Sequence, residues 1–198
     1  ISDTVENQAG KLICIGMVRD EIDVINEWIA HALCIFDKII LVDHRSTDGT
    51  REQLFLASQK VKKINVYLYD GAEYLQSELM NYILKNECVV KRDDWVFMLD
   101  SDEFLESMDP IEIKKRLAVQ KSNIVSLRWK NLIPCNYDDA GIYNRNFFKL
   151  DANSKTTKIA FKPYFFSNYR IEQGNHFLHD SRSKSIIAAP LFDISLLH

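Results

Sequence analysis

Four short apolar runs, each followed by a segment with helical periodicity, constrain the fold of this chain more than any other feature. The runs are continuous in aliphatic and aromatic residues, which is typical of strands buried on both faces of a parallel sheet. They cover residues 11–17, 38–43, 64–69 and 94–100. Helical spacing of apolar residues covers 21–34, a segment beginning at 48–50, 73–90 and 109–119. This repetition predicts an α/β domain with a mostly parallel, Rossmann-like sheet flanked by helices.

The second half of the chain has a different pattern, because helical periodicity fades after residue 119. Strand-like runs separated by loop signals cover residues 124–129, 147–150 and 158–166. We expect a more irregular, antiparallel extension of the same sheet. The aromatic run Tyr164-Phe165-Phe166 could meet a lipid-linked acceptor, but the core is the preferred interpretation. Residues 1–198 are therefore interpreted as one domain.

Composition excludes several classes of protein. The chain has 198 residues, 46% of them hydrophobic, and a net charge of −3, which argues against disorder and against a nucleic-acid-coating surface. No apolar run reaches the roughly 20 residues of a membrane span. The four cysteines include no pair with zinc-binding spacing. We expect a cytoplasmic domain that can associate with the inner face of the membrane. The missing initiating Met and the apolar C-terminal segment suggest that it is excised from a longer protein.

Ligands of a parallel α/β sheet bind at the carboxyl ends of its strands, and here those ends carry Arg19, Asp43 and Asp100. The strongest local signal is Asp100-Ser101-Asp102-Glu103-Phe104, directly after an expected buried strand. Two carboxylates separated by one residue point the same way from an extended segment. Such oxygen ligands suit a hard divalent cation that keeps positions open for diphosphate oxygens and water. The pattern predicts a metal site, although an acidic surface turn would look similar.

Asp43 opens a second candidate motif, Asp43-His44-Arg45-Ser46-Thr47-Asp48-Gly49-Thr50. A carboxylate at the end of a strand can face a ligand at the sheet edge, where it can accept the N3–H of uracil. The residues from Ser46 onward also suit a turn and a helix cap, and capping is the preferred role of Asp48. Asp43 is therefore the candidate ligand-binding residue of this motif.

Together these motifs resemble the family-2-related glycosyltransferases of GT-A fold. The likeness rests on Val18-Arg19-Asp20-Glu21, on Asp43-x-x-Ser46-x-Asp48-Gly49-Thr50 and on Asp94-Trp95 leading into Asp100-Ser101-Asp102-Glu103-Phe104. It is closest to the subgroup with an R-N/D-E start and a D-x-D-E-F metal motif, and it covers about residues 11–105 well. It implies a metal-dependent glycosyltransferase that moves a sugar, with inversion, from a nucleotide-diphosphate donor to a hydroxyl acceptor. UDP is the expected nucleotide.

The resemblance also implies roles for individual residues. Asp43 would bind the base, and Asp100 and Asp102 would hold the ribose and a Mn²⁺ or Mg²⁺ ion. The residues implied in donor binding are Arg19, Glu21, Asp43, Gln76, Asp100 and Ser101. Residues of about 11–105 would form the nucleotide-sugar-binding half, and about 106–198 the half facing a glycan, lipid-linked or other hydroxyl acceptor.

The remaining assignments stay open between alternatives. In similar enzymes a C-terminal histidine completes the metal shell, and here it is either His176, in a Gly-Asn-His element, or His198, in a closing Leu-His element. The general base is either Asp139 or Glu172. Three further basic residues either contact phosphate or acceptor or lie on a solvated face: Lys158, Lys162 and Arg170.

Two other functions compete with glycosyl transfer. A sugar nucleotidyltransferase could share the sheet, but it would need a Gly-rich, Arg- or Lys-bearing loop after the first strand. This chain has Met17-Val18-Arg19-Asp20 there, with Gly16 as its only glycine. A non-catalytic domain of a larger protein would keep the fold and lose the metal ligands, whereas Asp100 and Asp102 are both present.

Overall fold

A computed structural model describes residues 10–134, 148–151, 155–166 and 168–198 of the chain. Its helices are α2 Ile25–Ile35, α3 Thr50–Lys60, α4 Gln76–Asn86, α5 Pro110–Ala118 and the short 3₁₀ helix η2 Pro163–Phe165. Its first six strands are β1 Leu12–Val18, β2 Lys38–His44, β3 Ile64–Tyr69, β4 Trp95–Met98, β5 Phe104–Leu105 and β6 Ile124–Pro134. The others are β7 Phe148–Asp151, β8 Thr157–Phe161, β9 Tyr169–Ile171, β10 Leu178–Asp180, β11 Ser185–Ile186 and β12 Ala189–Leu197.

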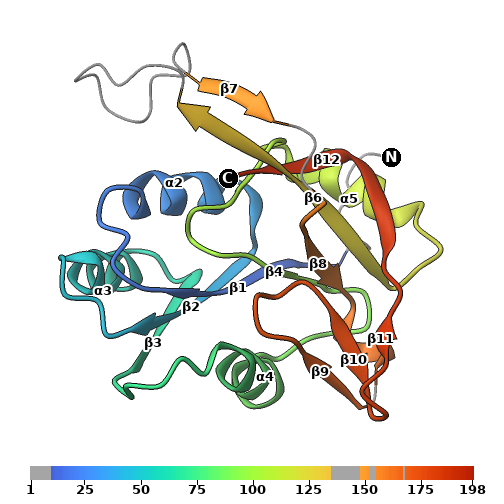
Figure 1. The fold of residues 1–198 in the computed structure, drawn as a ribbon, viewed down its shortest axis with the longest axis horizontal. Coiled ribbons are helices and arrows are strands. Elements are labelled where there is room, and N and C mark those ends of the chain that lie inside the picture. Colours follow the sequence, from blue (N-terminus) through green and yellow to red (C-terminus); the bar gives the residue numbers. More distant parts are fainter. Residues whose placement is uncertain (1–9, 135–147, 152–154, 167) are drawn as a thin grey trace.

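Within the described ranges, one large sheet has the strand order β3-β2-β1-β4-β8-β6-β12-β5, with β7 paired to β6 (Figure 1). The four strands β3, β2, β1 and β4 are parallel. β8 is antiparallel to β4 and to β6, so the second half of the chain extends the same sheet in the predicted antiparallel sense. β12 departs from this expectation because it runs parallel to β6. A small antiparallel sheet, β11-β10-β9, lies beside the large one.

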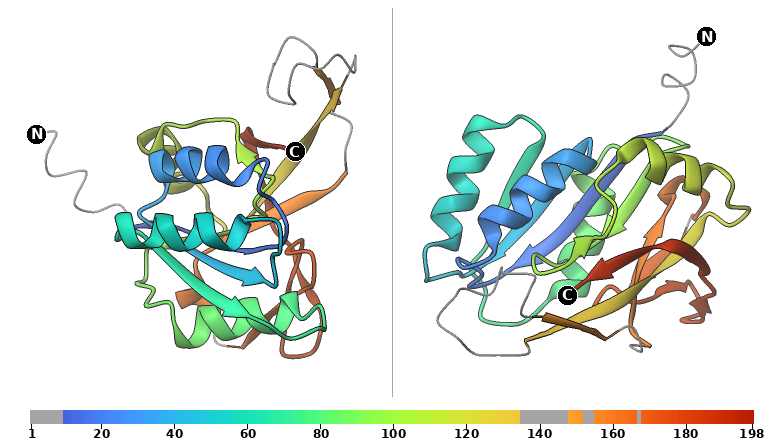
Figure 2. Two further views of the ribbon diagram at one scale, coloured as in Figure 1. Left: turned by 90° about the vertical axis from the view of Figure 1, so that its left-hand side faces the viewer. Right: turned by 90° about the horizontal axis from the view of Figure 1, so that it is seen from above.

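Apolar residues cover both faces of the large sheet, as the continuous apolar strands predict. Helices α2, α3 and α5 pack on one face through a core that includes Trp28, Leu54 and Leu117. Helix α4 and the small sheet pack on the other face, through Met80, Leu178 and their neighbours. Figure 2 shows α2 and α3 on one side of the strands and α4 on the other. The predicted α/β fold class is therefore confirmed.

Helices α4 and α5 lie inside the ranges that periodicity predicts, and α2 ends one residue beyond its predicted range. α2 begins at Ile25 rather than at residue 21, and a turn closed by the Ile25 N–H on the Glu21 carbonyl at 2.8 Å precedes it. α4 covers residues 76–86 of the expected 73–90, and it ends where two successive backbone N–H groups donate to the Ile83 carbonyl. α5 opens at Asp109-Pro110 as expected, with the Asp109 carboxylate accepting from the Ile111 N–H at 2.9 Å. Among the described residues, no helix combines the length and the apolarity of a membrane span.

The segment after β8 contradicts the prediction made for its aromatic residues. The expected strand over residues 158–166 stops at Phe161, because Pro163 cannot donate to a ladder and instead opens η2. Tyr164 is 62% exposed and Phe165 is 40% exposed, so these two rings are not core residues. Phe166 alone packs against the core.

Candidate functional site

The loops after β1 and β2 interlock at the carboxyl edge of the parallel strands. Val18 and Asp43, the residues beside these loops, are partners in the parallel ladder. The Asp20 carboxylate accepts from the Thr47 backbone N–H at 2.7 Å, and the Thr50 hydroxyl accepts from the Glu21 N–H at 2.8 Å. The two sequence motifs thus form one continuous structure at this edge.

Asp100, which follows β4, is held on both carboxylate oxygens. Its Oδ1 accepts from the Gln76 amide at 3.1 Å, and its Oδ2 accepts from Lys158 Nζ at 2.5 Å. The Lys158 side chain is only 1% exposed, donates also to the Gly174 carbonyl at 2.8 Å, and lies 3.3 Å from Glu103 Oε1. A lysine buried to this degree is normally paired, and this one sits between two carboxylates.

Glu103 is the buried partner in this cluster. Its Oε2 accepts from the Asp100 backbone N–H at 3.0 Å, and its backbone carbonyl accepts from the indole of Trp28 at 2.9 Å. Burial, and then the negative charge of Asp100, raise the pKa of Glu103 to about 8, although Lys158 acts in the opposite direction. The loop after β4 is therefore anchored to α2 and to β8, which fixes the direction of Asp100.

A tight turn over residues 172–175 completes the enclosure of Asp100. The Asn175 N–H donates to the Glu172 carbonyl, and both Gly174 and Asn175 have positive φ angles, of 85° and 61°. The Gly174 N–H donates to the Gln76 side-chain oxygen at 2.7 Å, and the Asn175 amide lies 3.4 Å from Asp100 Oδ1. The turn therefore connects α4 to the carboxylate that follows β4.

Asp102 pairs with the last residue of the chain. Its Oδ2 lies 3.1 Å from His198 Nε2, and the two side chains are 42% and 37% exposed. The His198 ring stacks on Trp129 with 4.4 Å between centroids and 6° between planes. Burial alone would raise the pKa of Asp102, but the hydrogen bond and charge of His198 hold it below its usual value. The same hydrogen bond raises the pKa of His198.

Two neighbouring side chains at this edge, those of Asp102 and His198, could bind a metal cation. Among the described residues, no three His, Cys, Asp or Glu side chains converge as a complete metal site. Asp102 and His198 offer one carboxylate and one imidazole side by side, each partly open to solvent. A divalent cation bound here would need further oxygen ligands from water or from its substrate.

Asp43 is fully buried at the end of β2. Its Oδ2 accepts from Arg51 Nε at 2.6 Å, and Arg51 also donates to Asp70 at 2.7 Å. Its Oδ1 is buried without a hydrogen-bond partner. Because an unpaired buried carboxylate oxygen is costly, this atom is a candidate acceptor for a ligand N–H.

Three other predicted donor-binding residues lie near this edge in different environments. Glu21 is partly buried, and burial together with the charge of Asp102 raises its pKa to about 7. Ser101 is buried, at 3% exposure. Arg19 is exposed, and its guanidinium lies 3.6 Å from Asp20. Glu21 is thus electrostatically coupled to the Asp102 pair, whereas Arg19 is free to reorient.

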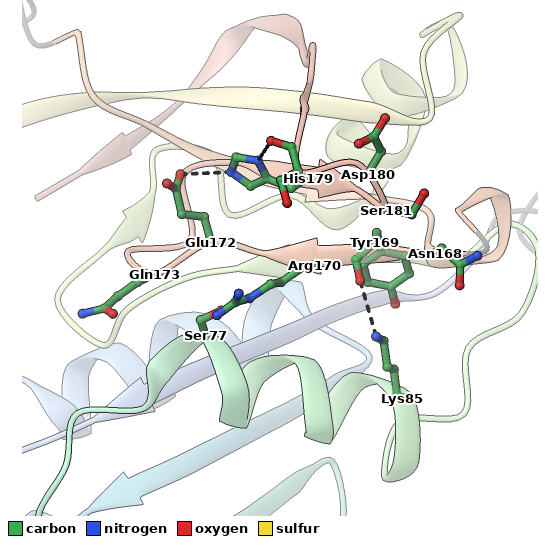
Figure 3. Close-up of a pocket in the computed structure, with 11 residues that line it drawn as sticks. Ser77, Lys85, Asn168, Tyr169, Arg170, Glu172, Gln173, His179, Asp180 and Ser181 are labelled. Atoms are coloured by element: carbon green, nitrogen blue, oxygen red, sulfur yellow. Dashed lines mark hydrogen bonds and ion pairs between the residues drawn. The ribbon is translucent and has the colours of Figure 1, made fainter.

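The other described candidates for the metal shell and the base, His176 and Glu172, have polar partners other than Asp102 and His198. His176 Nδ1 lies 2.7 Å from the Thr157 carbonyl, and its ring packs near Trp129. Glu172 is 3.5 Å from His179, and both line a hollow of about 600 Å³ between α4 and the small sheet (Figure 3). Asp139 lies outside the described residues.

The sequence-based assignment missed several residues that complete this edge. The role of Lys158 was left open, although a lysine within the apolar run Thr157–Phe161 was a signal of a buried, paired charge. Arg51 follows the Asp-Gly-Thr motif directly, in the first turn of α3, and no local pattern indicated its pairing with Asp43 in β2. Trp129 gave no signal, because its contact with His198 joins two strands of the second half.

Comparison with known proteins supports the fold and leaves the family open. No family model matches the sequence, and no curated protein is similar to it in sequence. The mannosyltransferase PcManGT of Pyrobaculum calidifontis, solved in complex with GDP-Man and Mn²⁺, matches 96% of this chain and 57% of its own, with a TM-score of 0.56 and 14% identity. At this identity the likeness establishes a GT-A-like fold and nothing finer.

Two further solved structures match less closely. TarS of S. aureus in complex with UDP-GlcNAc matches 61% of this chain and 35% of its own, with a TM-score of 0.49 and 18% identity. The 4-diphosphocytidyl-2C-methyl-D-erythritol synthase of Anaerococcus prevotii matches 79% of this chain and 71% of its own, with a TM-score of 0.43 and 13% identity. The chain spans about a third of the TarS chain and little more than half of PcManGT.

Proposed function

We propose that this chain is the catalytic domain of a metal-dependent glycosyltransferase that takes its sugar from a uridine-diphosphate donor. The observation that carries the proposal is the 3.1 Å contact between Asp102, in the loop after β4, and His198, at the end of β12. It lies at the carboxyl edge of the parallel strands, where Asp43 lies at the end of β2 and Asp100 follows β4. Ligands of open α/β sheets bind at this edge.

Asp102 and His198 fit a divalent cation such as Mn²⁺ or Mg²⁺. They supply one oxygen and one nitrogen, and their partial exposure leaves room for phosphate and water oxygens. Such a cation, when bound, stabilises the negative charge that develops on a leaving diphosphate. The stacked Trp129 ring holds the imidazole in one orientation, as supporting residues of metal ligands do.

Asp43 and Asp100 are assigned to the nucleoside. Asp43 Oδ1, the oxygen without a partner, would accept the N3–H of uracil after the side chains that cover it move aside. Asp100 remains 30% exposed while Gln76 and Lys158 fix both of its oxygens, so it is a preorganised acceptor for the ribose hydroxyls.

The reaction that suits this arrangement is a single displacement. The acceptor hydroxyl attacks the anomeric carbon, the bond to the diphosphate breaks, and the hydroxyl proton passes to a carboxylate base. One displacement inverts the anomeric configuration. Glu172 and Asp139 remain the candidates for the base, and Glu172 already pairs with His179 in the hollow beside α4.

Calorimetric titration of UDP with and without Mn²⁺ tests the proposal. Asp102→Asn and His198→Gln should each weaken Mn²⁺-dependent UDP binding by at least about tenfold, as loss of a metal ligand does. Asp93→Asn is the matched control, because it removes an exposed carboxylate at the opposite edge of the sheet. UDP binding that does not depend on Mn²⁺ would contradict the assignment, and so would an equal loss of UDP affinity in all three variants. GDP and CDP in parallel titrations test the choice of base.

A further inference from the structure

The amino edge of the parallel strands, opposite the candidate site, carries a row of basic residues. Lys11 precedes β1, Lys63 precedes β3, and Lys91 and Arg92 precede β4. The ladder partners Ile39 and Ile64, and Leu12 and Trp95, place the beginnings of these strands side by side. Lys38 is the first residue of β2, and Lys62 lies beside Lys63 before β3, so basic residues gather where all four parallel strands begin.

The second half of the chain adds two more basic residues to the same edge. β8 runs antiparallel to β4, with Phe161 opposite Val96, so Lys162 lies beside the beginning of β4. The Lys162 N–H donates to the Asn123 carbonyl, which brings the turn containing Lys121 alongside. We call this set the basic edge; its members are Lys11, Lys38, Lys62, Lys63, Lys91, Arg92, Lys121 and Lys162.

Acidic residues in the same loops neutralise only part of this charge. Asp37 is paired with Lys114 at 3.1 Å. Asp94 is buried and accepts from two backbone N–H groups, those of Lys11 and Lys91. Asp93 lies 3.6 Å from Lys162 and is exposed. The basic edge therefore keeps a local positive excess in a chain whose net charge is −3.

Exposed aromatic rings lie among these cations. Tyr164 and Phe165 form η2, directly after Lys162, and are 62% and 40% exposed. The Arg92 guanidinium carbon lies 5.9 Å from the Tyr164 ring centroid and 5.5 Å from that of Phe165. Val89, three residues before Arg92, is 85% exposed. Apolar side chains are thus exposed at the site where the positive charge gathers.

We propose that the basic edge and η2 bind the anionic surface of a phospholipid membrane. Lys and Arg side chains are attracted to anionic headgroups, each strengthening attachment by roughly fivefold. Aromatic residues such as Tyr164 favour the headgroup level, where one end of the ring is apolar and the other wet. A single-stranded nucleic acid fits less well, because base stacking needs an open ring face, and the Arg92 guanidinium already lies near one face of each ring.

This orientation has a consequence for the candidate site. The carboxyl edge of the strands is at the far end of the sheet from the basic edge. A chain bound to a membrane through the basic edge would therefore present Asp102 and His198 to the aqueous phase. The inference does not depend on the proposed function, since it rests on a different set of residues.

Vesicle co-sedimentation of the full chain tests the proposal. The vesicles are phosphatidylcholine alone, or phosphatidylcholine with about a third phosphatidylserine, at about 0.05 M and about 0.5 M NaCl. The chain should bind only the phosphatidylserine vesicles and release them at high salt. Lys91→Glu/Arg92→Glu should weaken binding by more than about tenfold. Tyr164→Ser/Phe165→Ser should weaken it by about threefold to tenfold and reduce the part of binding that resists salt.

The matched control is Arg45→Glu/Arg128→Glu, which makes the same change of charge on exposed residues outside the basic edge. It should keep at least about half of the binding, because screening limits the effect of distant charges. Circular dichroism establishes that each variant is folded. The proposal is overturned if the wild-type chain does not bind phosphatidylserine vesicles, or if both charge variants lose binding equally. Preferential, Arg92-dependent binding of a single-stranded oligonucleotide over the vesicles would also overturn it.

Discussion

The two ends of the same parallel strands differ in how they hold charge. At the carboxyl edge, Asp43, Glu103 and Lys158 are buried, and each lies against a charged partner from another element. At the amino edge, Lys62, Arg92 and their neighbours are exposed. Burying a charge is unfavourable unless its partners are fixed in place. The buried charges at the carboxyl edge therefore lower the stability of the fold in exchange for polar groups held in fixed positions. That difference marks the carboxyl edge as the candidate site.

Removing the buried cation should give the largest effect. Lys158→Met leaves Asp100 and Glu103 without their shared partner, and we expect the free energy of unfolding to fall by about 3–5 kcal/mol. Lys162→Met, directly after β8 at the amino edge, should change it by less than about 1 kcal/mol. Urea unfolding of both variants measures the contrast. Equal effects would remove the distinction between the two edges.

A change in the turn over residues 172–175 should have an intermediate effect. Gly174 has a φ of 85°, and a Cβ added there would lie 2.7 Å from the His176 ring. Gly174→Ala should therefore lower the free energy of unfolding by about 1–3 kcal/mol. It should also weaken UDP binding, because the Gly174 backbone bonds both Gln76 and Lys158. A variant as stable as the wild-type chain would show that the turn is not constrained as described.

The smallest predicted effect is a pH dependence that involves Glu21. Its folded pKa of about 7 exceeds its ordinary value of 4.5, so the unfolded chain loses this proton first and stability falls as pH rises from 4.5 to about 7. Glu21→Gln should flatten the stability curve over this range. At pH 8 the variant should be more stable by roughly 1 kcal/mol, allowing for partial solvent screening.

An exposed acid at the amino edge provides the comparison for Glu21. Asp93→Asn removes one exposed carboxylate at the amino edge and is the matched control for the loss of a carboxylate. Thermal unfolding between pH 4 and pH 8 measures both curves. A curve for Glu21→Gln that keeps the wild-type slope would show that burial and the charge of Asp102 do not raise the pKa of Glu21.

The fold of the first half could be predicted because its signals are local. Continuous apolar runs mark β1 to β4, and helical spacing marks the helices between them. The beginning of α2 was missed because Ile22, in the turn that precedes the helix, continues the helical spacing of apolar residues. In the second half, β12 pairs parallel to β6 through a long connection, a choice that strand patterns do not encode.

The candidate site was predictable only in part, because sequence patterns record local structure but not contacts between distant segments. Asp43 lies at the end of β2, and Asp100 and Asp102 lie in the loop directly after β4, so their position follows from the strand pattern. Their partners Arg51, Lys158 and His198 come from elsewhere in the chain, and only folding brings them together. The sequence could not decide between His176 and His198, since the Gly-Asn-His element and the closing Leu-His element each suit a metal-binding histidine. The contact of His198 with Asp102 supports His198 as the metal ligand of the proposed function.

The central claim is that Asp102 and His198 form a cation site beside a nucleotide pocket. Crystals grown with UDP and Mn²⁺, with anomalous diffraction data collected at the manganese edge, test it most directly. The account predicts one anomalous peak within about 2.5 Å of an Asp102 oxygen and of His198 Nε2, with diphosphate density beside it. Ordered UDP with the manganese peak elsewhere, or ordered UDP with no peak, would contradict it.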